Sequence, residues 1–142
     1  MRYLCLICAE RVMEQLTPEE AERHFEEYRE FNRNMRASGH LVGANRLQPP
    51  ETATTIRVRK GKVAATDGPW VETKEQLGGY YVIDARDLNE AIQIAAKIPG
   101  AWIGAVEIRP IADDAVTTEM LALADESWLR DWPLMEDGSP MD

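Results

Sequence analysis

Apolar and polar residues follow two spacings along this chain, one typical of β-strands and the other typical of amphipathic helices. The run Tyr3–Cys8 is apolar throughout and predicts a buried strand. Runs that alternate or are rich in β-branched residues predict further strands at Leu41–Leu47, Thr54–Arg59, Val63–Thr66, Gly79–Ala85 and Ala105–Ile111. The segment Lys60–Lys62 has a central glycine, which predicts a hairpin turn between the strands on either side of it.

Two helices are predicted between these strands. Thr17 can cap the first helix, Pro18 suits its first position, and Glu20 is placed to complete a capping box. Its helical spacing should end near Ser38–Gly39, where glycine suits the C-terminal end. The residues that recur at this spacing are His24, Phe25, Tyr28, Phe31, Asn32 and Met35. Asp87 begins the second helix by the same capping logic, and Pro99–Gly100 should end it.

The order of these elements is β-α-β, a hairpin, and then β-α-β. It predicts an α+β fold of the ferredoxin-like, split-βαβ kind, with an antiparallel sheet and helices on one face. Such a sheet leaves its other face uncovered. A second copy, packed sheet against sheet, is the commonest remedy, so we expect a homodimer.

The C-terminal extension, residues 113–142, differs from the body, residues 1–112. The extension carries nine acidic residues and one arginine, whereas the body is close to neutral within a total net charge of −9. Apolar residues near one face of 117–129 predict a helix there. We therefore expect one domain of 1–112, followed by an acidic helix and tail.

Composition excludes several classes of function. Nucleic-acid binding needs a net-positive face, and neither part of the chain supplies one. No apolar run approaches the roughly 20 residues that span a bilayer, so we expect no membrane contact and a cytoplasmic location. Glycine-rich nucleotide loops and the Gly-x-Ser-x-Gly motif are missing from the sequence, and the two histidines have no ligands at metal spacing. We expect no metal and no cofactor.

Cys5 and Cys8 have the Cys-x-x-Cys spacing of redox and metal motifs. On a strand, however, an offset of three places them on opposite faces. We therefore interpret them as small apolar residues of the sheet.

Chemically useful residues are densest in the segment from Thr66 to Tyr81. Asp67 precedes Gly-Pro, so its carboxylate is either an acid or base held at a pocket rim or the acceptor of an Asx turn. Glu72 and Lys74 share a face and can pair if the chain is extended there. If Thr73 caps a helical turn instead, Gln76 completes a capping box and these charges are solvated.

The other residues of this segment also have two interpretations. Gly78–Gly79 either allows close approach of a ligand or partner, or meets a need for unusual φ angles. Trp70, Tyr80 and Tyr81 either line an apolar pocket or pack in the core or a dimer contact.

Histidine supplies the other candidate for acid/base chemistry. His24 lies on a mostly apolar helical face, where it can act as an acid or base or can be a partly buried, hydrogen-bonded residue. His40 follows a glycine in a loop and is the weaker candidate.

Asp67-Gly-Pro-Trp70 and Glu72-Thr-Lys-Glu-Gln-Leu-Gly-Gly79 resemble the DGPF-motif proteins, which are grouped as YCII-related. Leu47-Gln-Pro-Pro50 and Val106-Glu-Ile-Arg-Pro110 extend the resemblance over roughly residues 1–111. The resemblance implies a dimeric α+β barrel of ferredoxin-like subunits. It also implies a genomic association with extracytoplasmic-function sigma factors, while the biochemical role of the family is largely unassigned.

A His–Asp pair is proposed for the broader YCII group. In this sequence the group's helical His falls near Tyr28, with His24 one turn earlier, and Ile98-Pro99 stands where the group has Asp-Pro. Acid/base chemistry of that type would need Asp67 as a substitute.

Two functions follow from these residues. The first is a dimeric module that binds a small ligand, through Tyr28, Trp70, Glu72, Lys74 and Tyr80, or a protein such as a sigma factor. The alternative is a cofactor-free acid/base enzyme in which Asp67 is the main polar group and His24 assists.

Overall fold

The structure is a computed structural model that describes residues 1–10 and 14–122. The chain divides into two compact units, Met1–Ile111 and Ala112–Asp142, which are considered separately. Within the described residues, no helix has the length and apolar character needed to cross a membrane.

The first unit is built on a four-stranded antiparallel sheet with the strand order β2-β5-β1-β6. These strands are β1 (Arg2–Ala9), β2 (Leu41–Arg46), β5 (Gln76–Asp84) and β6 (Ala105–Pro110). β1 and β2 flank β5, so the first βαβ unit is split by an inserted strand. The predicted ferredoxin-like α+β fold is confirmed.

Helix α1 (Pro18–Ser38) begins and ends as the sequence predicts. The Glu20 amide donates a hydrogen bond to Thr17 Oγ1 at 3.2 Å, which satisfies one of the free N–H groups of the first turn. Gly39 ends the helix in the left-handed conformation, at φ 79°. The amides of Gly39 and His40 then bond back to the Arg36 and Met35 carbonyls.

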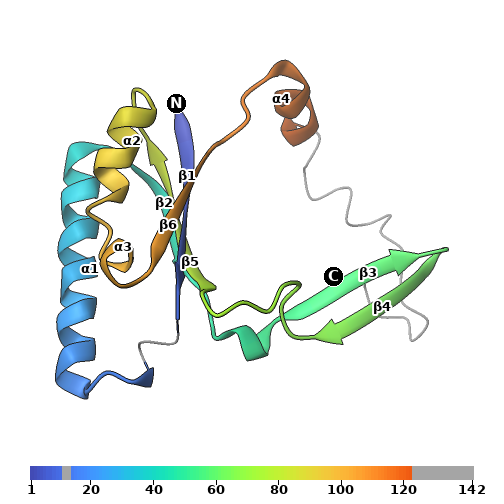
Figure 1. The fold of residues 1–142 in the computed structure, drawn as a ribbon. Coiled ribbons are helices and arrows are strands. Elements are labelled where there is room, and N and C mark those ends of the chain that lie inside the picture. The colour runs from blue at the N-terminus through green and yellow to red at the C-terminus, as the bar shows by residue number, and fades with distance from the viewer. Residues whose placement is uncertain (11–13, 123–142) are drawn as a thin grey trace. The chain divides into compact units, whose positions relative to one another are not determined.

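The second helical region is more broken than predicted. Asp87 caps α2 (Leu88–Ala95) by accepting from the Glu90 amide at 2.9 Å. Helix α2 ends at Ala95, before Pro99–Gly100, and a short helix, α3 (Gly100–Ile103), starts at Gly100. The predicted helix end at Pro99–Gly100 misses α3, because proline is also common at the start of a helix. All three helices cover one face of the sheet (Figure 1).

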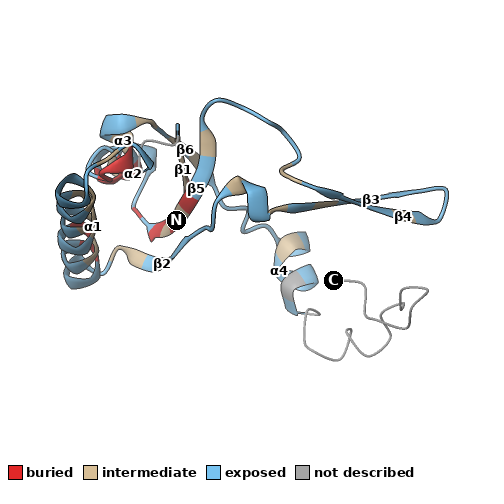
Figure 2. Cartoon of the chain, turned by 90° about the horizontal axis from the view of Figure 1, so that it is seen from below, coloured by how far each residue is buried: buried red, intermediate tan, exposed pale blue. Residues whose placement is uncertain are grey.

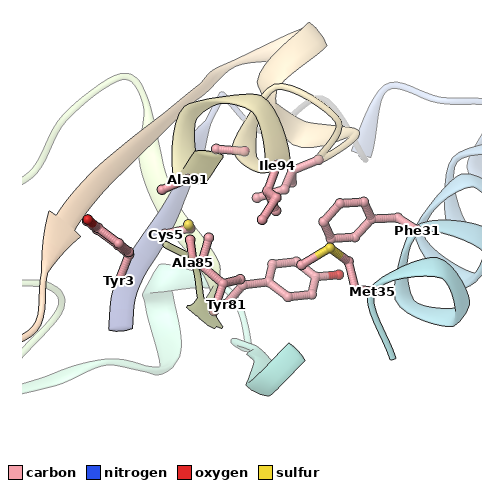
Figure 3. Close-up of a cluster of buried hydrophobic side chains, with 11 residues drawn as sticks. Tyr3, Cys5, Phe31, Met35, Tyr81, Ala85, Ala91 and Ile94 are labelled. Carbon is pink, nitrogen blue, oxygen red and sulfur yellow. The ribbon is translucent and has the colours of Figure 1, made fainter. Parts of the chain in front are cut away.

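The core lies between this helical layer and the sheet. Phe31 and Met35 of α1 meet Tyr81 of β5, and the ring planes of Phe31 and Tyr81 stand at 81° with centroids 5.1 Å apart (Figure 3). Cys5 is fully buried on this face, whereas Cys8 is only partly buried, which fits the predicted opposite orientations. Burial is concentrated where the helices meet the sheet (Figure 2).

The predicted hairpin forms a separate two-stranded sheet. β3 (Thr54–Arg59) pairs with β4 (Lys62–Asp67), and both Lys60 and Gly61 have positive φ in the turn. The single turn η2 (Pro50–Thr52) precedes it, and the hairpin extends away from the main sheet (Figure 1).

The second unit contains α4 (Ala115–Ala122), which begins where the Thr117 amide donates to the Asp114 carboxylate. The helix predicted at 117–129 is confirmed as far as 122. The rest of that prediction, including Trp128 and the acidic tail, lies outside the described residues.

Candidate functional site

A pocket of about 560 Å³ lies beside the N-terminal half of α1 at one end of the main sheet. The last residues of β1 and β2, the first residues of β5 and both ends of α3 contribute to its wall. Its volume falls within the range of about 300–1,000 Å³ that is usual for small-ligand sites. Side chains that shape it include Ile7, Phe25, Tyr28, Arg46, Tyr81 and Ile103.

His24 and Tyr28 occupy neighbouring turns of α1 and both line this pocket. Their rings meet edge to face, with centroids 5.0 Å apart and planes at 86°. Both nitrogens of the His24 ring lack hydrogen-bond partners among the described residues. The imidazole is therefore held by an aromatic contact while its polar atoms stay available to a ligand.

The Tyr28 hydroxyl is fixed from the other side of the pocket. The Gly100 amide donates to its oxygen at 3.0 Å, which leaves the phenolic proton free to donate onward. Burial raises the pKa of Tyr28, although the bond from Gly100 partly opposes the shift. At neutral pH this hydroxyl is a donor.

Tyr81 and Asn32 form a second polar pair in the same wall. The Tyr81 hydroxyl donates a short hydrogen bond to Asn32 Oδ1. Burial, with a smaller contribution from nearby Tyr28, raises the pKa of Tyr81 to about 12. Both phenols thus stay protonated under ordinary conditions.

Gly100 allows the side chains of Ile7 and Tyr28 to approach the backbone closely at the pocket wall. A Cβ at this position would lie 2.5 Å from Ile7 Cγ2 and 2.7 Å from the Tyr28 hydroxyl oxygen. Ile98, at the position where the broader group has Asp, is fully buried in the core. The contact to Tyr28 in this region therefore comes from a backbone amide and not from a carboxylate.

Polar side chains that line the pocket include Arg46, Glu10 and Gln76. The Arg46 guanidinium carbon lies 5.2 Å from the centre of the Phe25 ring. Glu10 pairs with Lys74 at 3.3 Å. The Gln76 Oε1 atom is buried and accepts no hydrogen bond within the described part of the chain, which is an unfavourable state for a buried acceptor.

Asp67 lies in a different depression, of about 580 Å³, which is lined by Glu72, Thr73 and the Asp-Gly-Pro turn. Its side chain is exposed and accepts no hydrogen bond from residues 1–10 or 14–122, so the Asx-turn interpretation finds no support. Gly68 holds the turn instead. Its φ is +103°, its amide donates to the Ala53 carbonyl, and its own carbonyl accepts from Thr55 Oγ1.

The charges after the turn do not form the predicted pair, because Lys74 contacts Glu10 and Glu72 lines the Asp67 depression. The helical alternative at Thr73 is wrong, since Gln76 begins strand β5. Trp70 is 64% exposed and stacks on Arg57, whose guanidinium carbon is 4.3 Å from the ring centre.

Gly78 and Gly79 lie in strand β5, where Gly79 is close to the backbone of β2. Neither Gly78 nor Gly79 has positive φ, so the interpretation that requires unusual φ angles is wrong. A Cβ on Gly79 would lie 3.0 Å from the Asn45 carbonyl oxygen, so glycine here allows the close approach of β2. The close contact is with a neighbouring strand of the same chain.

The structure therefore divides the predicted site residues. His24, Tyr28 and Tyr80 line the first pocket, Asp67 and Glu72 line the second, and Lys74 and Trp70 line neither of them. Pro50 and Gln76 contribute to both pockets.

Sequence reasoning missed Arg46, Gln76 and Gly100 as residues of the first pocket. Arg46 ends a strand without a motif, the spacing from Thr73 places Gln76 in a possible capping box, and the sequence around Gly100 predicts only the end of a helix. Of the described residues, no group of three or more His, Cys, Asp or Glu is placed to hold a metal ion.

Fold and pocket together define a class of protein: a ferredoxin-like α+β body with a ligand-sized pocket between its helical layer and one end of its sheet. The family model of the YCII-related domain matches residues 1–114. Uncharacterized protein R00369 of Rhizobium meliloti (strain 1021) is 37% identical over 105 residues, which cover 72% of this chain and 85% of that protein. The chain belongs to the YCII-related family.

Proposed function

We propose that this protein is a small-ligand-binding module whose site is the pocket beside α1. One observation carries the proposal: in a cavity of about 560 Å³, the His24 ring lies among apolar and aromatic side chains and its nitrogens have no hydrogen bond to a described residue. A few polar groups in a mostly apolar cavity are typical of sites for small molecules. The Tyr28 proton and the Gln76 oxygen add one donor and one acceptor.

A fragment screen monitored by NMR of the ¹⁵N-labelled protein tests this function. We expect shifts concentrated at residues 24–32 and 76–81 for the fragments that bind. Ala44 lines the pocket, so Ala44→Phe should fill it and remove these shifts. Ala64→Phe is the matched control, because Ala64 lies on β4 and lines neither pocket. Shifts that persist in Ala44→Phe would place binding elsewhere and reject the proposal.

An acid/base enzyme is the alternative. The contact between the His24 imidazole and the protonated phenol of Tyr28 favours it, because such groups can exchange protons with a bound substrate. Asp67 lines the neighbouring depression and not this pocket, so His24 and Tyr28 would be the acid/base groups of such an enzyme. His24→Asn should then abolish turnover of a bound compound while its affinity stays within about threefold. Equal turnover in both proteins would reject catalysis by His24.

We further propose that a second copy covers the face of the sheet opposite the helices. Leu4, Leu6 and Val82 point to that face and are only partly buried. Leu6→Glu should convert a dimer into a monomer in sedimentation equilibrium. A protein partner of the sigma-factor kind would use the acidic extension, so deletion of residues 113–142 should abolish that association and leave the dimer folded.

A further inference from the structure

We propose that the pocket beside α1 takes a small carboxylic acid with an apolar, ring-sized body, and that Arg46 binds the carboxylate. The inference rests on the proposed function, because it names the chemical class of ligand for the same pocket. Three features support it: a cation on the wall without an ion pair to a described residue, apolar side chains in the same wall, and polar atoms that can bind a substituent on the ligand.

Arg46 is the cation. Its planar guanidinium stacks on Phe25, and this contact limits the orientations that the group can adopt. Its side chain has neither a hydrogen bond nor an ion pair with any residue in the ranges 1–10 and 14–122. An arginine in this state can form two parallel hydrogen bonds with a carboxylate, a geometry that gives both strength and orientation.

Two carboxylates share the rim with Arg46, and both are engaged. Glu10 forms its ion pair with Lys74, so the two charges offset each other. Glu14 also has an interaction partner. Arg46, by contrast, has no ion pair with a described residue, so its charge is available to a ligand.

Apolar side chains line the same pocket as Arg46. Ile7, Phe25 and Ile103 line the same cavity, and the rings of Tyr28 and Tyr81 complete the wall. An apolar ring would contact this surface on several sides, which favours its transfer from water. A ligand that is polar throughout would gain no such transfer free energy from the apolar wall.

Two polar atoms of the same pocket can bind a polar substituent on the ligand. Tyr28 keeps its proton free for a hydrogen bond, and the buried Gln76 oxygen needs a donor. A hydroxyl substituent on the ring could donate to Gln76. Hydroxylated acids should therefore bind more tightly than the parent acid.

Titration with matched probes tests the class of ligand. We expect benzoate to bind in the pocket at least about tenfold more tightly than benzyl alcohol, because only its carboxylate forms charge-assisted hydrogen bonds with Arg46. Benzylamine should bind more weakly than either, because its ammonium group is repelled by Arg46. Arg46→Gln should reduce benzoate to the affinity of benzyl alcohol, and Arg46→Lys should retain an intermediate affinity. Arg59→Gln, on β3 and outside both pockets, should change nothing.

Two further measurements do not depend on the arginine variants folding normally. Raising the salt concentration should weaken benzoate binding to the unaltered protein and leave benzyl alcohol unaffected. At least one of the three hydroxybenzoates should bind more tightly than benzoate, and Gln76→Leu should remove that preference.

The outcomes separate this inference from the proposed function. Equal affinity for benzoate and benzyl alcohol, or unchanged benzoate binding in Arg46→Gln, would overturn the carboxylate class while binding in the pocket stands. If no probe and no fragment shifts the resonances of the pocket, the proposed function fails and the inference fails with it.

Discussion

The pocket beside α1 and the depression at Asp67 share Pro50 and Gln76, yet their other lining residues differ in chemical character. Aromatic and aliphatic side chains line much of the pocket, and burial has raised the pKa values of its phenols. The depression is lined by exposed acidic side chains and a glycine turn. Among the described residues, no aromatic ring lines the depression, whereas the pocket wall holds several beside the His24 ring.

This difference shows how one motif can have two uses. The Asp-Gly-Pro turn needs Gly68 at φ +103°, and its backbone bonds to Ala53 and Thr55 join the ends of the hairpin. The later part of the same segment, Gln76–Tyr81, forms the start of β5 and one wall of the pocket. The first half is architectural in this structure, whereas the second half faces the candidate ligand site.

Replacing one aromatic residue in each region gives the largest contrast. Tyr81→Ala should lower the free energy of unfolding by about 3–5 kcal/mol, because it removes a buried ring that packs on Phe31. Trp70→Ala should cost less than about 1 kcal/mol, since Trp70 is exposed and has one stacking contact with Arg57. Urea denaturation measures both. Similar losses would show that the Trp70 region is packed as firmly as the pocket.

Alanine substitutions at two glycines test how tightly the pocket is packed at Gly100. Gly100→Ala should destabilise the protein by about 1–3 kcal/mol, because the new methyl group would overlap Ile7 and the Tyr28 hydroxyl. Gly43→Ala is the control, since no described atom lies within 4 Å of a Cβ at that position. Thermal denaturation should separate the two variants. If Gly100→Ala leaves the stability unchanged, the side chains of Ile7 and Tyr28 can move to accommodate the methyl group, and the Tyr28 hydroxyl is not fixed by Gly100.

Alkaline pH probes the phenols of the pocket. The pKa of Tyr81 is about 12 in the folded protein and about 10 when the chain is unfolded, so folding favours the neutral form. Its contribution is complete below pH 10 and is lost as the pH rises to 12. Over that interval the unaltered protein should lose about 1–3 kcal/mol more unfolding free energy than Tyr81→Phe.

Cys5 makes the comparison with Tyr81→Phe necessary. Burial raises the pKa of the Cys5 thiol from 9.0 to about 11, so this group adds a loss of the same sign that both proteins share. Urea titrations at several pH values between 9 and 12 measure the difference between the two proteins. Parallel curves would show that the Tyr81 hydroxyl ionises as readily in the folded protein as in the unfolded chain.

The fold was predictable to a greater extent than the site. Periodicity, the cap at Thr17 and the left-handed Gly39 define the sheet and first helix through local rules. The site depends on which strand ends meet, and local patterns carry no such information. Arg46 and Gln76 come together from strands that are 30 positions apart in sequence, and neither has a motif. Pro99–Gly100 shows the limit of local signals, because the same dipeptide can end one helix and begin another.

The smallest expected effect belongs to Asp67→Asn. Its carboxylate is exposed and has no hydrogen bond to a described residue, so the free energy of unfolding should change by less than about 0.5 kcal/mol. Binding of benzoate in the first pocket should also stay unchanged, because Asp67 does not line it. Both are measured on one sample, by urea denaturation and by NMR titration. A loss of affinity with the fold intact would mean that the two depressions act as one site through Gln76, and Asp67 would then regain the role that its motif suggests.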